Sequence, residues 1–493
     1  MRFSRKSNVF SVLLLMIFLA GILISPGFAQ NPVVFVPKVV GNGEFAFADG
    51  DADDASFAFP YGLAYSEKDD ALIIADMQNH RIRSLDLKTF QVTTIAGKDS
   101  GVDRFGFPAG GYIDGDVSEA LFNRPRGLAV AQNGAILVAD TGNHAIRQIF
   151  EGEVTTIAGG LNSGYKDDRS CDASFYFPSG LAIDGDGNIF VADTLNNVIR
   201  KIDPAAYVTT FAGDKENTDL LNEPVGLAFA DDGGLYVADG GNHSIKKVFA
   251  DGKIEKVAGK VSVKDAESGY WAGGYLDASG SESYFNFPKG IAVNEDGIIY
   301  VADSYNHLIR GIDLNAGDED AEVSVDDVKV FTAAGSGVAG KTIGGAGRVD
   351  FDGPVALAWA KDTLFVADHW NNRIIMIPDT GVYLAPIETH EKGSIPVFLN
   401  GRETIFPDVQ PFIVDGRVRV PVRAIAEAWG AEVTWNEEAR AFTVLSNGQV
   451  VEFTEAAGDF FTHEGRSMIQ LRTLGEKLGL KVEWLNGSVA IAD

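Results

Sequence analysis

One motif recurs six times along this 493-residue chain, and it constrains the fold more than any other feature. It reads Pro-x-Gly-Leu-Ala, then a short variable segment, then Val-Ala-Asp-x-x-Asn-His/Asn-x-Ile-Arg. Its six copies begin at Pro60, Pro125, Pro178, Pro224, Pro288 and Pro354. A motif repeated at this spacing is typical of proteins that stack copies of one small structural unit.

Each copy predicts a small antiparallel sheet. The Gly-Leu-Ala-Val/Ile run is short and apolar, as expected for a strand buried on both faces. Turn segments such as Asp-Gly-Asp-Gly-Asn at 184–188 then supply residues that accept positive φ. The Val-Ala-Asp run and the Ile-Arg-x-Ile run provide a second and a third strand, and a Val-Thr-Thr-Ile-Ala-Gly type segment provides a fourth. Six such sheets predict a mainly β chain that forms a six-bladed β-propeller.

The two ends of the array predict how this ring closes. The sixth copy runs through Ile377 but lacks the fourth-strand segment, and a matching segment, 36–41, precedes the first copy. Because an unpaired sheet edge is prone to aggregation, we expect this N-terminal strand to complete the sixth sheet.

The repeated motif resembles the NHL repeat, and the resemblance covers residues 33–377. The resemblance implies a six-bladed β-propeller that serves as a binding platform. A minority of relatives with this ring geometry are lyases or lactonases.

The N-terminus predicts export. Arg2, Arg5 and Lys6 precede an apolar stretch at 9–24, and small residues at 27 and 29 offer a cleavage site, so residues 1–29 read as a signal peptide. An uncleaved anchor is the alternative. We expect a secreted or cell-surface protein on the extracellular side of a bacterial envelope, with no membrane span after signal removal. A formal net charge of −28 argues against nucleic acid as a partner.

A second repeat follows a predicted linker at 378–394. Within residues 395–493, two halves align at an offset of 49 residues, for example at Gly430 and Gly479, and each half predicts a strand pair, a helix and a hairpin. This duplicated α+β domain resembles the copper amine oxidase N-terminal domain. It holds one histidine, His463, and no cysteine, so we assign it no copper site. We expect an accessory or attachment domain, and the cell wall is one partner that it could contact.

The repeated polar residues favour structural roles. Four repeats place histidine in one slot where the other two place asparagine, which favours a turn hydrogen bond over zinc. The repeated aspartates follow Val-Ala and are expected to accept bonds from turn amides; they are Asp76, Asp140, Asp193, Asp239, Asp303 and Asp368. The acidic segment 49–54 favours a solvated loop, with weak calcium binding as the alternative. No cofactor, metal ligand or catalytic residue is assigned.

Specific function is expected where the repeats differ. The residue after each repeat proline and the residue after each aspartate vary, and both sets are predicted to approach one face of the ring. The predicted ligand-binding rim comprises Tyr61, Arg126, Ser179, Lys289, His369 and Trp370. This rim suits a polar or anionic ligand, although variable surface positions would give the same pattern.

The leading prediction is an exported binding or scaffold protein whose propeller face engages a protein, peptide or glycan. The alternative is a metal-assisted lyase or lactonase that uses the central channel, but the six inner-strand starts carry no carboxylate or histidine. A cell-envelope structural protein held by the C-terminal module is a third option.

Overall fold

The computed structural model describes residues 38–260, 271–314, 325–343 and 349–378, together with the strands and helices given below between 397 and 492. The predicted signal peptide at 1–29 and positions 379–394 of the predicted linker lie outside these described residues.

Within the described part of 38–378, the strands form six antiparallel sheets, which we call blades one to six. From the inside outward, blade one contains β3 (Pro60–Ser66), β4 (Ala71–Asp76), β5 (Arg81–Asp86), β6 (Gln91–Ala96) and β2 (Gly50–Asp51). Blade two contains β8 (Pro125–Val130), β9 (Ile136–Asp140), β10 (Ala145–Phe150), β11 (Glu153–Gly159) and β7 (Gly115–Asp116). Blade three contains β13 (Pro178–Ile183), β14 (Ile189–Asp193), β15 (Val198–Ile202), β16 (Tyr207–Gly213) and β12 (Asp168–Arg169).

The other three blades have four strands each in the described residues. Blade four contains β17 (Pro224–Phe229), β18 (Leu235–Asp239), β19 (Ser244–Val248) and β20 (Ile254–Ala258). Blade five contains β21 (Pro288–Val293), β22 (Ile299–Asp303), β23 (Leu308–Asp313) and β24 (Lys329–Ala334). Blade six contains β25 (Pro354–Ala360), β26 (Thr363–Asp368), β27 (Arg373–Pro378) and β1 (Lys38–Val40).

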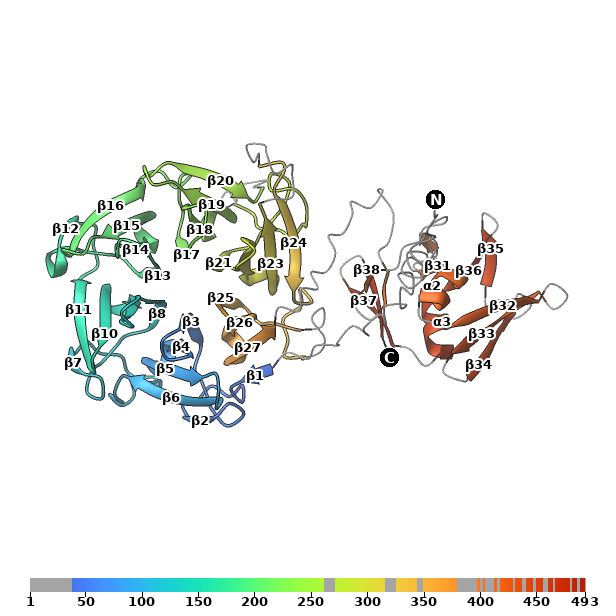
Figure 1. Cartoon of the computed structure of the whole chain (residues 1–493), viewed down its shortest axis with the longest axis horizontal. Helices are drawn as coiled ribbons and strands as arrows, with labels where there is room; N and C mark the ends of the chain where they lie inside the picture. The colour runs from blue at the N-terminus through green and yellow to red at the C-terminus, as the bar shows by residue number, and fades with distance from the viewer. Residues whose placement is uncertain are drawn as a thin grey trace, which may run out of the picture. The chain divides into compact units, whose positions relative to one another are not determined.

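The blades form a ring whose innermost strands contact one another in a closed order (Figure 1). The glycine of the repeat allows this close approach. A Cβ atom added at Gly62 of β3 would lie 1.8 Å from the carbonyl oxygen of Arg126 in β8, and one at Gly127 would meet Ser179 in the same way. Apolar residues fill the space between successive blades, as when Val138 and Ile73 pack in one buried cluster. The core is therefore divided among the blade interfaces, as expected for a β-propeller.

Blade six draws its outer strand from the beginning of the chain. β1 pairs antiparallel with β27, and Val39 lies opposite Ile375. This is the closure that the missing fourth-strand segment predicts. A hydrogen bond between blades one and six accompanies this strand pairing: the Phe59 amide donates to the Asn372 side-chain oxygen at 3.0 Å.

The C-terminal module contains two helices and three sheets among its described elements. Its first half comprises β30 (Phe412–Val414), β31 (Arg417–Pro421), α2 (Val422–Ala428), β32 (Glu432–Asn436), β33 (Ala441–Ser446) and β34 (Gln449–Thr454). Its second half comprises β35 (Phe460–His463), β36 (Arg466–Gln470), α3 (Leu471–Leu478), β37 (Lys481–Leu485) and β38 (Ser488–Ala492), and two short strands, β28 (Val397–Leu399) and β29 (Arg402–Glu403), precede both halves. The halves share a sheet through the pairing of β31 with β36, where Val420 lies opposite Ile469. In the described part of the chain, no helix has the length and apolar character needed to cross a membrane.

Candidate functional site

The register of each blade brings the two variable positions to one end of the sheet. The repeat proline that starts each inner strand lies opposite the repeat aspartate, as in the pairs Pro60–Asp76 and Pro288–Asp303. The residue after the proline and the residue after the aspartate therefore share that end of the blade. A single 3₁₀ turn follows each aspartate; these turns are Met77–Asn79, Thr141–Asn143, Thr194–Asn196, Gly240–Asn242, Ser304–Asn306 and His369–Asn371.

The His/Asn slot forms a hydrogen bond between neighbouring blades. Each slot residue ends its 3₁₀ turn in the left-handed conformation, for example at φ 54° in His80, a region that His and Asn tolerate better than most residues. The Nδ1 atom of His80 accepts the backbone amide of Arg124 at 2.9 Å, and the Oδ1 atom of Asn197 accepts that of Glu223 at 2.9 Å. Imidazole and amide thus supply an acceptor at the same place, which explains why they interchange.

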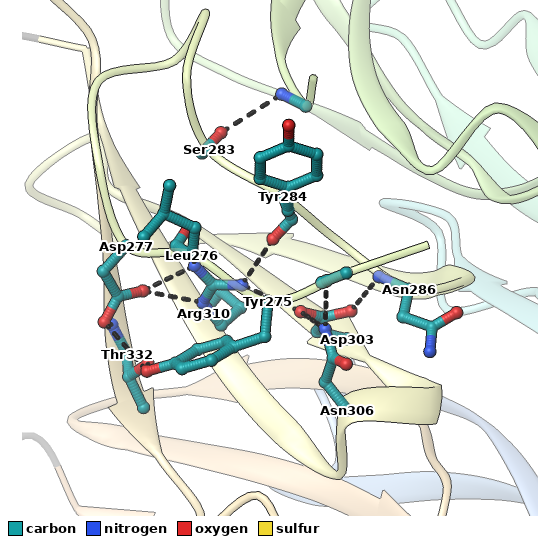
Figure 2. A network of polar contacts seen from close by, with 12 residues as sticks. Tyr275, Leu276, Asp277, Ser283, Tyr284, Asn286, Asp303, Asn306, Arg310 and Thr332 are labelled. Atoms are coloured by element: carbon teal, nitrogen blue, oxygen red, sulfur yellow. Dashed lines mark hydrogen bonds and ion pairs between the residues drawn. The ribbon is translucent and has the colours of Figure 1, made fainter. Parts of the chain in front are cut away.

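The repeated aspartates organise a buried ion-pair network, drawn for blade five in Figure 2. Asp303 accepts the Asn286 amide at 2.7 Å and the Asn306 side-chain amide at 2.8 Å. It also pairs with Arg310 at 2.9 Å, and the Arg310 Nε atom donates to Asp277 at 3.0 Å.

Two aromatic rings complete the environment of each such arginine. The Arg310 guanidinium lies 4.9 Å from the Tyr275 ring centre and 5.0 Å from the Phe285 ring centre. The same arrangement recurs around Arg83, Arg147 and Arg200. Blade four departs from it, because Lys246 replaces the arginine and pairs with Asp239 at 2.7 Å.

The turn residue after the aspartate often bonds to the next blade. The Thr141 hydroxyl donates to the Pro178 carbonyl at 2.6 Å, and the Thr194 hydroxyl lies 2.8 Å from the Pro224 carbonyl. His369 follows this pattern, because its Nδ1 atom lies 3.1 Å from the Pro60 carbonyl oxygen. Since a carbonyl can only accept, this nitrogen carries the proton. The pKa of His369 is lowered to about 4, chiefly by burial; the hydrogen bond to Pro60 opposes this shift, and the positive charges of Lys289 and Arg126 contribute to it.

Four of the predicted rim residues lie in one chain of contacts. The Tyr61 ring lies 4.9 Å from the Arg126 guanidinium and 5.6 Å from the His369 ring. The Trp370 ring lies 5.0 Å from that of His369 and remains 52% exposed. Burial raises the pKa of Tyr61, and the positive charge of Arg126 opposes that shift.

Lys289 joins this group from blade five. Its ammonium group lies 5.1 Å from the ring centre of Tyr305, a neighbour that is 53% exposed. Burial lowers the pKa of Lys289 to about 8, and the positive charge of Arg126 adds to this effect. Neither side chain, Arg126 or Lys289, makes a hydrogen bond or an ion pair with any residue that the structure describes. The Nε atom of Arg126 is buried without an acceptor.

Ser179, the remaining predicted rim residue, contacts Thr194 and is not part of the chain of contacts described above. It is buried, and its hydroxyl receives a hydrogen bond from the Thr194 hydroxyl at 2.8 Å. This contact lies within blade three, and it is Thr194 that reaches blade four, through the Pro224 carbonyl.

Two aromatic residues beside this group were not predicted from the sequence. Tyr305 is the second residue of its 3₁₀ turn, and Phe59 precedes the repeat proline. The Phe59 ring packs on both His369, at 5.0 Å, and Trp370, at 4.8 Å. Trp370 occupies the same turn position as Tyr305, so comparing that position across the six copies would have identified Tyr305. Phenylalanine also precedes the repeat proline at Phe177 and Phe287, so the sequence does not single out Phe59.

Within the described ranges, no group of three or more His, Cys, Asp or Glu side chains lies close enough to hold a metal ion. Residues 395–493 contain one histidine, His463, and no cysteine, although the name of the resembled domain suggests copper. Asp49 of the acidic segment 49–54 is engaged by Arg83 and by the Thr94 amide, at 3.0 Å each.

The ring of sheets and its repeated motif define a β-propeller of the NHL-repeat type. Residues 59–342, more than half of the chain, match the SMP-30/Gluconolactonase/LRE-like region, so the chain belongs to that family. Residues 398–492 match the copper amine oxidase N-terminal domain.

The chain is also similar to individual proteins over parts of its length. The chain is 30% identical over 308 residues to the Arabidopsis thaliana protein SUPPRESSOR OF QUENCHING 1, chloroplastic, a match that covers 60% of this chain and 28% of the relative. It is 36% identical over 106 residues to human NHL repeat-containing protein 2, covering 20% of this chain and 14% of the relative. The chain thus spans less than a third of the length of these curated relatives. A structural genomics protein of unknown function from Bacteroides thetaiotaomicron VPI-5482 superposes with a TM-score of 0.50 at 18% identity, covering 70% of this chain and 75% of that one, and this likeness concerns the fold alone.

Proposed function

We propose that this chain is an exported binding protein whose face around the centre of the ring engages an extracellular protein, peptide or glycan. In this proposal the six blades form a propeller closed by the N-terminal strand, residues 1–29 direct export, and the protein is secreted or held at the cell surface. The duplicated α+β domain at 395–493 serves as an accessory or attachment module and could contact the cell wall.

One observation carries the proposal. The fold-building contacts recur from blade to blade, whereas Tyr61, Arg126, Lys289, Tyr305 and Trp370 occur once each at the end of the blades where the inner strands begin. Exposed aromatic rings beside cations without partners supply both apolar area and directed polar groups, which is the usual composition of a ligand site. The fold does not require a cation after the repeat proline, since blades four and six place Val225 and Val355 at that position.

The test is a binding screen with a matched pair of variants. The chain lacking residues 1–29 is screened against immobilised glycans and peptides, and each ligand found is titrated against Tyr305→Ala and Tyr207→Ala. Both tyrosines lie beside a cation and have similar exposure, 53% and 50%, but Tyr207 is on the outer strand β16. We expect Tyr305→Ala to weaken binding about tenfold or more and Tyr207→Ala to leave it unchanged. Equal affinities for the two variants would place the ligand elsewhere.

The family match favours one further candidate, a metal-assisted lactonase or lyase. It is tested by measuring lactone hydrolysis with and without added divalent cations. Metal-dependent turnover by the pure protein would favour this candidate, whereas ligand binding without turnover would favour the binding protein. Cell fractionation with and without residues 395–493 tests the attachment role separately.

A further inference from the structure

We propose that Arg126 and Lys289 together hold one anionic group, a carboxylate or a phosphate, of the ligand that the propeller face binds. This inference rests on the proposed function and specifies the chemistry of its site.

Arg126 and Lys289 lack any counter-charge in the described residues. The arginines of the repeated network, in contrast, each have a carboxylate partner, as does Lys246 in Asp239. Arg126 and Lys289 have none among the described residues, and the Arg126 Nε atom is buried without an acceptor. Arg126 and Lys289 are both partly buried, and even partial withdrawal of a cation from water is unfavourable without a partner, so the fold alone gives no reason to keep two of them.

Their positions in the ring bring the two cations toward each other. Arg126 and Lys289 occupy the same slot in blades two and five, and the residues of that slot in blades one, four and six, Tyr61, Val225 and Val355, pack in one buried cluster, so the slots converge at the centre of the ring. The charge of Arg126 accordingly repels that of Lys289 and lowers its pKa. An anion bound between the two cations would remove this repulsion. The rest of the protein carries the opposite sign, with a formal net charge of −28, so this site is a local exception to the charge of the molecule.

The ring contacts of the two cations also suit an anionic ligand. The guanidinium of Arg126 rests on the Tyr61 ring and the ammonium of Lys289 rests on the Tyr305 ring. A ring contact occupies the face of a guanidinium and leaves its N–H edges available. Those edges match the paired oxygens of a carboxylate or a phosphate, and the ammonium adds a compact second charge.

The experiment measures binding of acetate and of inorganic phosphate to the chain lacking residues 1–29, by thermal shift and calorimetry at constant ionic strength. We expect at least one of these anions to bind, and Arg126→Gln and Lys289→Gln each to weaken that binding about tenfold or more. Acetate without phosphate identifies a carboxylate site, and the reverse identifies a phosphate site. The control is Lys201→Gln, which removes a lysine that lies over the ring of Phe190 in blade three. A milder variant, Arg126→Lys, keeps the test decisive if Arg126→Gln does not fold.

A pH series adds an independent readout. Binding is expected to weaken as the pH rises through about 8, because Lys289 then loses its proton. Absence of binding by both anions, or binding that is unchanged in both glutamine variants, overturns the inference.

The ligands found in the screen separate this inference from the proposed function. If Tyr305→Ala loses such a ligand while Arg126→Gln and Lys289→Gln retain it, the binding face stands and the anion site is wrong. If all three variants bind normally, both proposals fail.

Discussion

Two sets of cations in the same ring differ in whether carboxylates accompany them. Arg310 and its equivalents lie between two aromatic rings and two carboxylates; Figure 2 shows Tyr275, Asp277 and Asp303 around Arg310 in blade five. Arg126 and Lys289 also lie on aromatic rings, but no carboxylate accompanies them in the described part of the chain. The difference teaches that contacts repeated in the blades serve the fold, whereas an uncompensated charge that occurs once is a candidate for function.

Removing a carboxylate from the repeated network should have the largest effect. Asp303→Ala leaves Arg310 buried without its inner partner, leaves the Asn286 backbone amide without its acceptor and removes one of the two acceptors of the Asn306 side-chain amide. We expect a loss of about 3–5 kcal/mol in the free energy of unfolding of the propeller, measured by chemical denaturation. Asp186→Ala, in the exposed hairpin turn of blade three, is the control and should change little. A loss as small as that of the control would show that the network does not stabilise the fold.

Replacing the Arg310 guanidinium with an ammonium group should have a smaller effect on the free energy of unfolding. In Arg310→Lys a single ammonium cannot reach both Asp277 and Asp303, although it keeps one ion pair, as Lys246 does in blade four. We expect a loss of about 1–3 kcal/mol by the same measurement. If the lysine variant is as stable as the parent, the second carboxylate is dispensable.

Acid should weaken the bonds between blades. Burial lowers the pKa of His80, His144 and His243, so the folded state favours neutral imidazoles while the unfolded chain takes up protons below a pH of about 6.5. The unfolded state then binds more protons, and stability falls as the pH falls below that value. Replacing all three histidines with Asn, the residue of the same slot in blades three and six, should preserve stability at pH 7.5 and reduce its decline toward pH 5. Melting temperatures across this range provide the check, and parallel curves for parent and variant would contradict it.

The two unpartnered cations should matter least for stability. Arg126→Met and Lys289→Met each remove a charge that has no partner, so we expect an unchanged or slightly higher free energy of unfolding, by no more than about 1 kcal/mol. The same denaturation measurement tests this. A marked loss in either variant would place that cation with the fold-building set and remove the contrast between the two sets.

The sequence predicts the repeated features well because most of them are local. The six strand sets and the turn role of His80 and Asn197 follow from patterns within one copy, whereas the closure by the first strand follows from comparing the two ends of the array. The particular carboxylate partners of the arginines were not identified, although Asp114 precedes Arg147 by 33 residues and Asp277 precedes Arg310 by the same interval.

The rim residues were predicted one repeat at a time, from the positions that vary, but their contacts with one another depend on ring closure. Arg126 and Lys289 come from blades that are not neighbours, so no local spacing links them. At His369, sequence variation alone does not separate a ligand role from a structural one. The residue at this position varies between repeats, as a ligand residue would. Its ring is nevertheless buried and bonded to the Pro60 carbonyl, so His369 also belongs to the interface between blades six and one.

The pairing of β1 with β27 has a consequence for how the protein matures. Val39 has to wait for Ile375 to be synthesised before its sheet can form, so the last blade assembles only when nearly the whole ring exists. Contacts between such distant positions form slowly, because a long chain must first bring its ends together. Until then the nascent chain is an open arc with unfinished edges at both ends. Loss of β1 would therefore damage the blade formed last.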